Sequence, residues 1–364
     1  MSWSLKIADF GETTLRVHIT FFLLLIWVAV SSWPFGGLAA ALDGIFFVIL
    51  IFVCVILHEF GHVLAARRYG IKTPDITVLP IGGLARLERM PEKPAQELWV
   101  AIAGPLVNVA IAAVLFMLLG ARFDLTDMAE FQSAQGSLQG RVAAVNLLIV
   151  AFNLIPAFPL DGGRMLRAAL AFRLDRARAT LIAARIGQTF AIVFAVVGLF
   201  YNPFLLLIAI FLFFAADAEA GHESMRAEAR GHTARDAMIS RYEGLTPGQS
   251  AEDAANLLIL TTQQEFPVIA ADGSFLGLVT RSGLIAAMKE KGPQTPVTDF
   301  METGIETVEA GAPLDDVLIK LYAHPSRAVA VRGAGGRFAG YINGENASEL
   351  FLLDRARRAA KRAF

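Results

Sequence analysis

Six long apolar runs constrain this chain more than any other feature of its sequence. A helix that crosses the hydrocarbon core of a bilayer needs about 20 mostly apolar residues, and six segments approach that length. We therefore expect an α-helical polytopic membrane protein with about six transmembrane helices. Only Asn202 lies between the last two runs, and Pro203 opens the second of them, which predicts a short turn there. The runs lie at residues 17–33, 42–66, 97–121, 139–157, 186–201 and 203–220.

Hydrophobicity is unevenly distributed along the 364 residues. The whole chain is 55% hydrophobic and 18% charged, whereas soluble domains are about 25% charged. Nearly all apolar runs fall before residue 220, and residues 221–364 resemble an ordinary soluble domain. This asymmetry predicts two parts, one in lipid and one in water. The net charge of −1 argues against a polyanionic partner, so we expect no nucleic-acid binding.

Basic residues between the apolar runs predict the orientation of the chain, because loops rich in arginine and lysine stay in the cytoplasm. They precede the first run and fill the loops between runs two and three and between runs four and five. The loop after the third run is acidic, with Asp124, Asp127 and Glu130. We therefore expect a multi-pass protein of a bacterial-type cell membrane, with its N-terminus and soluble tail in the cytoplasm. The basic residues are Lys6, Arg16, Arg67, Arg68, Lys72, Arg86, Arg89, Lys93, Arg164, Arg167, Arg173, Arg176, Arg178 and Arg185.

The motif His58-Glu59-Phe60-Gly61-His62 lies in the second run. Residues four apart on a helix are neighbours, so both imidazoles point to one side, where they could bind zinc. Glu59 could then accept a proton from a water molecule. Ile45–Leu57 just before the motif holds 13 residues without a charge, about 20 Å of helix. The motif therefore lies inside the bilayer, where ionisable groups are usually functional. The alternative is a pair of helix-packing histidines, with Glu59 paired to an arginine.

Asp161 is the candidate for a third ligand, because a catalytic zinc ion takes three protein ligands. Pro156 and Pro159 break the fourth run just before it, and Gly162-Gly163 after it allow close backbone approach. A broken helix at membrane depth is tolerated where it is buried in protein or lines a wet cavity. The alternative for Asp161 is a cap on a helix that begins near Arg164.

Taken together, these motifs resemble the site-2 protease family of intramembrane zinc metalloproteases. The resemblance implies one Zn²⁺ per chain, held by His58, His62 and Asp161, with Glu59 as general base. It also implies that Asn153 acts near the scissile carbonyl, where an amide can donate a hydrogen bond to a developing oxyanion. Asn108 is expected to stabilise helix packing by hydrogen bonds. The matching segments are 58–62, Gly104-Pro105-Leu106-Val107-Asn108, and Asn153 with Pro156 and Pro159-Leu160-Asp161-Gly162.

The segment Ile76–Glu88 alternates around Gly82-Gly83 and predicts a β-hairpin. In the family that the motifs resemble, a similar membrane-associated hairpin dips toward the active site. The resemblance implies that it offers a strand edge to an unwound substrate. A surface hairpin without a role in substrate binding is the alternative.

An internal repeat with an offset of 63 residues organises the tail, as in the matched pairs Asp236/Asp299 and Gly273/Gly336. Each copy mixes a helix with short strands, which predicts an α+β unit. The helices are expected at Ala251–Leu260 and Leu314–Tyr322, and the strands at Phe266–Ala270 and Ala328–Val331.

The two copies resemble a tandem pair of cystathionine-β-synthase (CBS) domains. Residues 277–280 and 340–343 stand where that family has its nucleotide signature, with Thr280 and Asn343 at its threonine positions. The aspartate positions of the signature hold Gly283 and Asn346. Two interpretations stay open, an adenine nucleotide site and a pair that dimerises or docks a partner without a ligand.

The sequence thus predicts five segments along the chain. They are a transmembrane metalloprotease domain at 1–220, a linker at 221–232, a first CBS domain at 233–291, a second CBS domain at 294–354 and a basic tail at 355–364.

The predicted function is zinc-dependent hydrolysis of a peptide bond in or near the transmembrane segment of a single-span membrane protein. Such regulated intramembrane proteolysis would release a membrane-tethered regulator and could be modulated through the CBS pair. The expected partners are that substrate, the lipid bilayer and a second copy of the chain that binds through the CBS domains. A CBS-regulated transporter or channel is one alternative, but it leaves the His-Glu-His-Asp pattern unexplained. An inactive protease-like scaffold is another, and the intact Glu59 argues against it.

Overall fold

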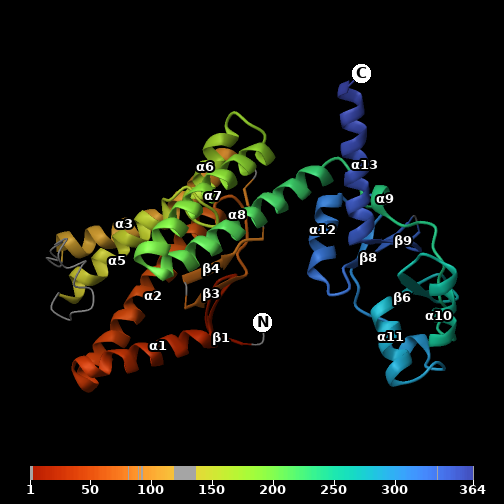
Figure 1. Ribbon diagram of the computed structural model, residues 1–364, viewed down its shortest axis with the longest axis horizontal. Helices are drawn as coiled ribbons and strands as arrows, with labels where there is room; N and C mark the ends of the chain where they lie inside the picture. Colours follow the sequence, from red (N-terminus) through yellow and green to blue (C-terminus); the bar gives the residue numbers. More distant parts are fainter. Residues whose placement is uncertain are drawn as a thin grey trace. The chain divides into compact units, whose positions relative to one another are not determined.

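The computed structural model describes residues 3–80, 82–88, 90–91, 93–118, 137–333 and 335–363 (Figure 1). The chain divides into two compact units, Met1–Glu223 and Ser224–Phe364. The predicted acidic loop with Asp124, Asp127 and Glu130 lies outside the described residues, as does Arg89.

Helices dominate the first unit. Four of them are long and apolar enough to cross a membrane, namely α2, α3, α7 and α8. They correspond to four of the six predicted spans, and the runs at 17–33 and 139–157 form shorter apolar helices. The turn at Asn202 separates α7 from α8, as predicted. The helices are α1 (Ile19–Ser32), the 3-10 turn η1 (Trp33–Phe35), α2 (Gly37–Arg67), α3 (Pro94–Leu118), α5 (Leu138–Asn153), α6 (Asp161–Ala171), α7 (Arg176–Tyr201) and α8 (Pro203–Ala229).

Two helices extend well beyond their predicted limits. α7 begins at Arg176, ten residues before the predicted span, so Arg176, Arg178 and Arg185 lie in the helix and not in a loop. The extension is possible because Asp175 caps this end and accepts a hydrogen bond from the backbone N–H of Arg178 at 3.1 Å. α8 continues to Ala229, so most of the predicted linker at 221–232 is helical.

Close packing of α2, α3, α5 and α6 forms the interior of the first unit. A Cβ added at Gly61 of α2 would lie 2.7 Å from the carbonyl oxygen of Ala103 on α3, so only glycine allows this approach. The outward faces of the helices are apolar, with Trp27, Phe204 and Phe211 more than half exposed. Large exposed apolar faces of this kind suit contact with lipid.

A four-stranded sheet with the order β1-β2-β3-β4 lies against these helices. Its strands are β1 (Ser4–Phe10), β2 (Thr13–His18), β3 (Asp75–Leu79) and β4 (Gly82–Arg86). The strands β3 and β4 pair antiparallel within the segment expected to form a hairpin. The hairpin β1–β2 was not expected, and β2 runs parallel to β3. One face of the sheet is buried because Leu15, Ile76 and Val78 pack on Phe52 and Val63 of α2.

The second unit repeats one α+β arrangement. The predicted helix Ala251–Leu260 is confirmed as α10, and the predicted helix Leu314–Tyr322 is confirmed as α12 with one further residue. Each copy has its own buried core. The elements are α9 (Ala234–Ala237), α10 (Ala251–Leu260), β5 (Glu265–Ile269), β6 (Phe275–Thr280), α11 (Arg281–Glu290), the 3-10 turn η2 (Val297–Asp299), β7 (Thr307–Glu309), α12 (Leu314–Ala323), β8 (Ala328–Arg332), β9 (Phe338–Asn343) and α13 (Gly344–Ala363).

Backbone pairing confirms that the sequence repeat is also a structural repeat. Ile239 and Tyr341 exchange two backbone hydrogen bonds, and the residues 63 positions away do the same, because Glu302 exchanges two with Leu278. Each copy therefore lends an extended residue to the hairpin of the other. The two copies fold as one interlocked unit.

Candidate metal centre

Three buried side chains from two helices converge in the first unit. His58 and His62 stand one turn apart on α2, and Asp161 is the first residue of α6. The Asp161 Oδ2 atom lies 3.1 Å from His58 Nε2 and 3.2 Å from His62 Nε2. The two Nε2 atoms are 3.1 Å apart. The fold thus brings together three donors that are separated by about a hundred residues of sequence.

The geometry of these donors fits a zinc ion. Zinc–nitrogen and zinc–oxygen bonds of about 2.0 Å in a tetrahedral site hold neighbouring ligand atoms about 3.3 Å apart. The observed edges of 3.1–3.2 Å come close to this value. His62 Nδ1 contacts the carbonyl oxygen of Val100 at 2.7 Å. Because that oxygen can only accept, His62 Nδ1 carries the proton and Nε2 keeps a lone pair for a metal.

Asp161 reaches the histidines because the chain is broken just before it. The helix α5 ends at Asn153, and the proline-containing segment that follows leads into α6. Leu160 occupies the N-cap position, so Asp161 is not the cap of α6. A Cβ added at Gly163 would lie 2.6 Å from the carbonyl carbon of Ala157, so glycine lets α6 fold back tightly on this segment.

The helix α3 closes the site from a third side. A Cβ added at Gly104 would overlap His62 Nε2 and would lie 2.6 Å from His58 Nε2. Glycine at this position therefore makes the space that the two imidazoles occupy. Asn108, one turn further along, is fully buried, but its side chain has no hydrogen-bond partner in the part of the chain that the structure describes. The expected hydrogen bonds of Asn108 between helices are therefore not seen there.

Glu59 faces the edge strand β4. The backbone N–H of Ala85 donates to Glu59 Oε2 at 3.3 Å. A Cβ added at Gly83 would lie 2.7 Å from Glu59 Cγ, so the strand packs directly on this side chain. Arg86, the arginine of β4, pairs with Asp75, so the alternative of a Glu59–arginine pair gains no support.

Asn153 is the last residue of α5 and is half-buried. Sequence reasoning missed three contributors to the site, namely Gly83, Gly104 as a spacer for the imidazoles, and the carbonyl oxygen of Val100. The only signals in the sequence were the glycines, because a backbone carbonyl carries no residue-specific signal.

The signature positions of the second unit act as helix caps. Thr280 Oγ1 accepts a hydrogen bond from the N–H of Gly283 at 3.2 Å, and Asn343 Oδ1 accepts one from the N–H of Asn346 at 2.9 Å. Asn343 Nδ2 also donates to Glu265 at 2.9 Å. Equivalent residues of the two copies thus stabilise equivalent helix starts.

Comparison with known proteins finds a matching family for each of the two units. The model of peptidase family M50 matches residues 46–135 and 125–198, and the CBS domain model matches residues 234–290. The zinc metalloprotease MJ0392 of Methanocaldococcus jannaschii is 32% identical over 348 residues, which cover 94% of each chain.

Two solved structures are also similar to parts of the chain. The site-2 protease from Methanocaldococcus jannaschii is 35% identical and covers 60% of this chain and 95% of its own, with a TM-score of 0.45. The CBS-pair protein CBSX2 from Arabidopsis thaliana is 23% identical and covers 35% of this chain and 98% of its own, with a TM-score of 0.32.

Proposed function

The chain belongs to peptidase family M50, the site-2 proteases, and we propose that His58, His62 and Asp161 hold the zinc ion of this intramembrane metalloprotease. The observation that carries the proposal is the buried triangle of donor atoms with edges of 3.1–3.2 Å. A bound zinc ion would polarise a substrate carbonyl and lower the pKa of a water molecule. The three donors leave the fourth tetrahedral position for the reaction.

Glu59 is the proposed general base. It belongs to the same helical turn as the histidines but is not one of the three clustered donors, so its carboxylate is free to accept a proton and pass it to the leaving amine. The N–H of Ala85 holds one of its oxygens, which fixes the direction of the carboxylate. Asn153, at the end of the broken helix, is proposed to donate a hydrogen bond to the oxyanion that forms on the scissile carbonyl.

The edge strand β4 is the proposed docking place of the substrate. A helical substrate hides its scissile carbonyl in its own hydrogen bonds, so it must unwind first. Among the described strands, β4 pairs with β3 alone, and its other side lies next to Glu59. An unwound segment that pairs with this edge would therefore lie beside the base. The proposed substrate is a single-span membrane protein, and its cleavage releases a membrane-tethered regulator.

The remaining features of the proposal concern topology and the second unit. Six spans, with the shorter helices α1 and α5 as two of them, would place both termini and the CBS pair in the cytoplasm of a bacterial-type cell. The CBS pair, at 233–291 and 294–354, is proposed to modulate cleavage. Adenine nucleotides are the ligands to test there. A nucleotide that binds the folded pair, present at 100 times its Kd, would stabilise it against unfolding by about 2.7 kcal/mol and would slow its hydrogen exchange. Unchanged hydrogen exchange of β6 and β9 with AMP or ATP would favour a pair that dimerises or docks a partner without a ligand.

Zinc content and cleavage test the proposal together. The purified full-length protein should hold about one zinc per chain, and His58→Ala and Asp161→Ala should lose it. Glu59→Gln should keep zinc but cleave a single-span reporter about 10²- to 10⁴-fold more slowly. A wild-type protein without zinc, after purification without chelators, would contradict the proposed site.

A further inference from the structure

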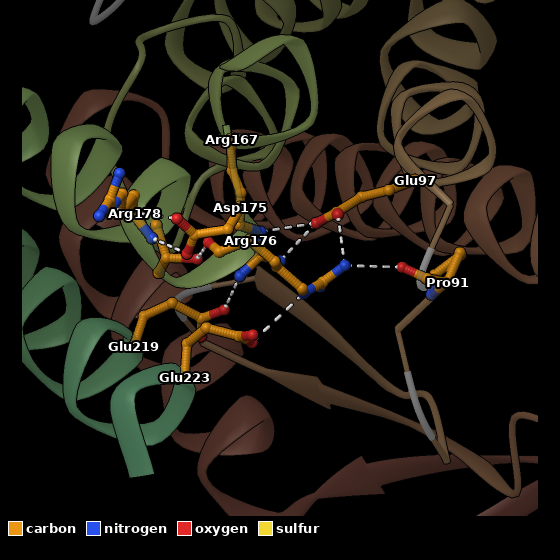
Figure 2. A network of polar contacts seen from close by, with 9 residues as sticks. Pro91, Glu97, Arg167, Asp175, Arg176, Arg178, Glu219 and Glu223 are labelled. Atoms are coloured by element: carbon orange, nitrogen blue, oxygen red, sulfur yellow. Dashed lines mark hydrogen bonds and ion pairs between the residues drawn. The ribbon is translucent and has the colours of Figure 1, made fainter. Parts of the chain in front are cut away.

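A buried cluster of charged side chains joins four helices of the first unit (Figure 2). At its centre, Arg167 of α6 is 1% exposed and Glu97 of α3 is fully buried. Arg167 Nε donates to Glu97 Oε1 at 2.7 Å, and its Nη1 pairs with Glu219 of α8. Arg176 of α7 donates from Nη1 to the other oxygen of Glu97 at 2.9 Å. The proposed mechanism uses none of these groups.

Packing alone does not account for this cluster. Taking two charges out of water costs several kcal/mol per ion, and apolar residues of similar volume often stabilise a fold as well or better. In some proteins such a pair instead selects one geometry of the fold. The question is then which geometry Arg167 selects.

Arg167 is linked to the chain both after and before Asp161. It lies on the same helix, six residues after Asp161, a rise of about 9 Å. Its guanidinium also stacks on Phe158, with Cζ 5.1 Å from the ring centroid. Phe158 is 1% exposed and stands three residues before Asp161. Arg167 thus ties the start of α6 to the loop that leads into it.

The partner of Arg167 belongs to the helix that orients His62. Glu97 lies three residues before Val100, whose carbonyl oxygen contacts His62 Nδ1 at 2.7 Å. The same helix carries Gly104, which makes room for both imidazoles. The Glu97–Arg167 pair therefore links the helix behind the histidines to the helix of the aspartate.

We infer that Arg167 is a positioning residue that holds Asp161 at ligand distance from His58 and His62. The inference rests on the proposed zinc site. Glu97 and Glu219 act with it, because they hold the guanidinium from α3 and α8. Groups that hydrogen-bond the ligands of a metal site typically change metal affinity by about 10- to 100-fold when they are removed. Arg167 acts on Asp161 through α6 and Phe158, so we expect an effect at the lower end of this range.

Zinc affinity of the purified full-length protein tests this role by competition with a chelator of known affinity. The variants are Arg167→Gln, the double variant Glu97→Gln/Arg167→Gln, which leaves no unpaired charge between these two residues, and Glu219→Gln, whose carboxylate is 39% exposed in the wild type. Arg178→Gln is the matched control, because Arg178 is 71% exposed and pairs with exposed Asp175 in the same region. The absorption of bound Co²⁺ reports the ligand geometry independently of activity.

The first two variants should bind zinc about 10-fold more weakly, Glu219→Gln should show a smaller loss, and all three should have an altered cobalt spectrum. Arg178→Gln should match the wild type. Wild-type affinity and spectrum in the double variant, or in Glu219→Gln if the double variant does not fold, would overturn the positioning role alone. A wild type without zinc would overturn the proposed metal site, and the role of Arg167 with it.

Discussion

At the scale of single residues, a missing side chain decides whether the metal centre can form. Gly104→Ala would place a methyl group 2.6 Å from His58 Nε2 and in overlap with His62 Nε2. Because the imidazoles must move, we expect zinc affinity to fall by at least about 10-fold, the lower end of the effects known for groups that orient ligands. Chelator competition on the purified protein measures this.

Gly221→Ala is the control for that substitution. Gly221 also lies within a helix, but a Cβ added there meets no other atom within 4 Å. Alanine in a helix interior is favoured over glycine by about 1 kcal/mol. Gly221→Ala should therefore bind zinc as the wild type does. Equal zinc affinity in Gly104→Ala and Gly221→Ala would show that the imidazoles can accommodate a methyl group at position 104, and it would contradict this prediction.

The residues of the site differ in how far sequence could predict them. His58, Glu59, His62 and Asp161 could be proposed because zinc chemistry demands these residue types. Asp161 also follows a proline-broken helix, which is a local signal. The contact between Gly83 and Glu59 could not be predicted, because it depends on how the sheet packs against α2 and leaves no mark in either segment.

At the scale of secondary-structure elements, β4 and α2 meet at Glu59. Gly83→Ala would bring a Cβ to 2.7 Å from Glu59 Cγ and 3.1 Å from Val55 Cγ1. Both contacts are too close, so we expect the carboxylate to shift while the zinc ligands stay in place. A shift of about 1 Å at a catalytic group can cost about 100-fold in rate. Cleavage should therefore slow by about 10- to 100-fold at unchanged zinc content.

Ala85→Gly is the control, because it changes a side chain of β4 without crowding Glu59. It removes a methyl group from β4 but keeps the N–H that donates to Glu59. Ala85 is partly buried, and glycine within a strand costs roughly 0.5–1 kcal/mol relative to alanine, so its cleavage rate should stay within about threefold of wild type. If Gly83→Ala cleaves as fast as Ala85→Gly, the packing of β4 on Glu59 does not affect catalysis, and the prediction is wrong.

Local signals in the sequence predicted the long helices. The helix ends that were predicted wrongly depend on contacts with residues far away in the chain. Apolar runs identify α2, α3, α7 and α8 because hydropathy depends on neighbours in the chain. The start of α7 was placed ten residues late because Arg176 looked like a loop residue. Its charge is matched by Glu97 and Glu223, which lie far away in sequence. The β1–β2 hairpin was not predicted, and β2 ends at His18, inside the apolar run that was expected to begin a span at residue 17.

At the scale of the whole molecule, the second unit should respond to pH through a carboxyl that links its two copies. Burial raises the pKa of Glu265 on β5, the hydrogen bond from Asn343 on β9 opposes the shift, and nearby Glu345 adds to it. The folded unit then binds this proton more tightly than the unfolded chain, where the pKa is about 4.3. The resulting stabilisation is complete below that value and is lost as pH rises through the folded pKa.

Glu265→Gln should therefore stabilise the second unit near neutral pH and make little difference at pH 4. Amide hydrogen exchange of β5 and β6 peptides in the full-length protein measures this. Exchange is needed because all four tryptophans, Trp3, Trp27, Trp33 and Trp99, lie in the first unit and their fluorescence does not report on the second. Slower exchange in the wild type than in Glu265→Gln near neutral pH would reverse the expected sign.

The division of the chain predicts that the metal centre is independent of the CBS pair. His58, His62, Asp161 and all members of the charged cluster lie within residues 1–223. A chain that ends at Ala229 keeps α8 complete, so it should retain about one zinc per chain with wild-type affinity. Any change in its cleavage rate then measures the influence of the second unit.

Because α8 carries Glu219 and Glu223 into the cluster, the truncated chain with Glu219→Gln should lose zinc affinity as the full-length variant does. Loss of zinc on truncation alone, in a protein that still elutes as a folded species, would show that the centre needs the CBS pair.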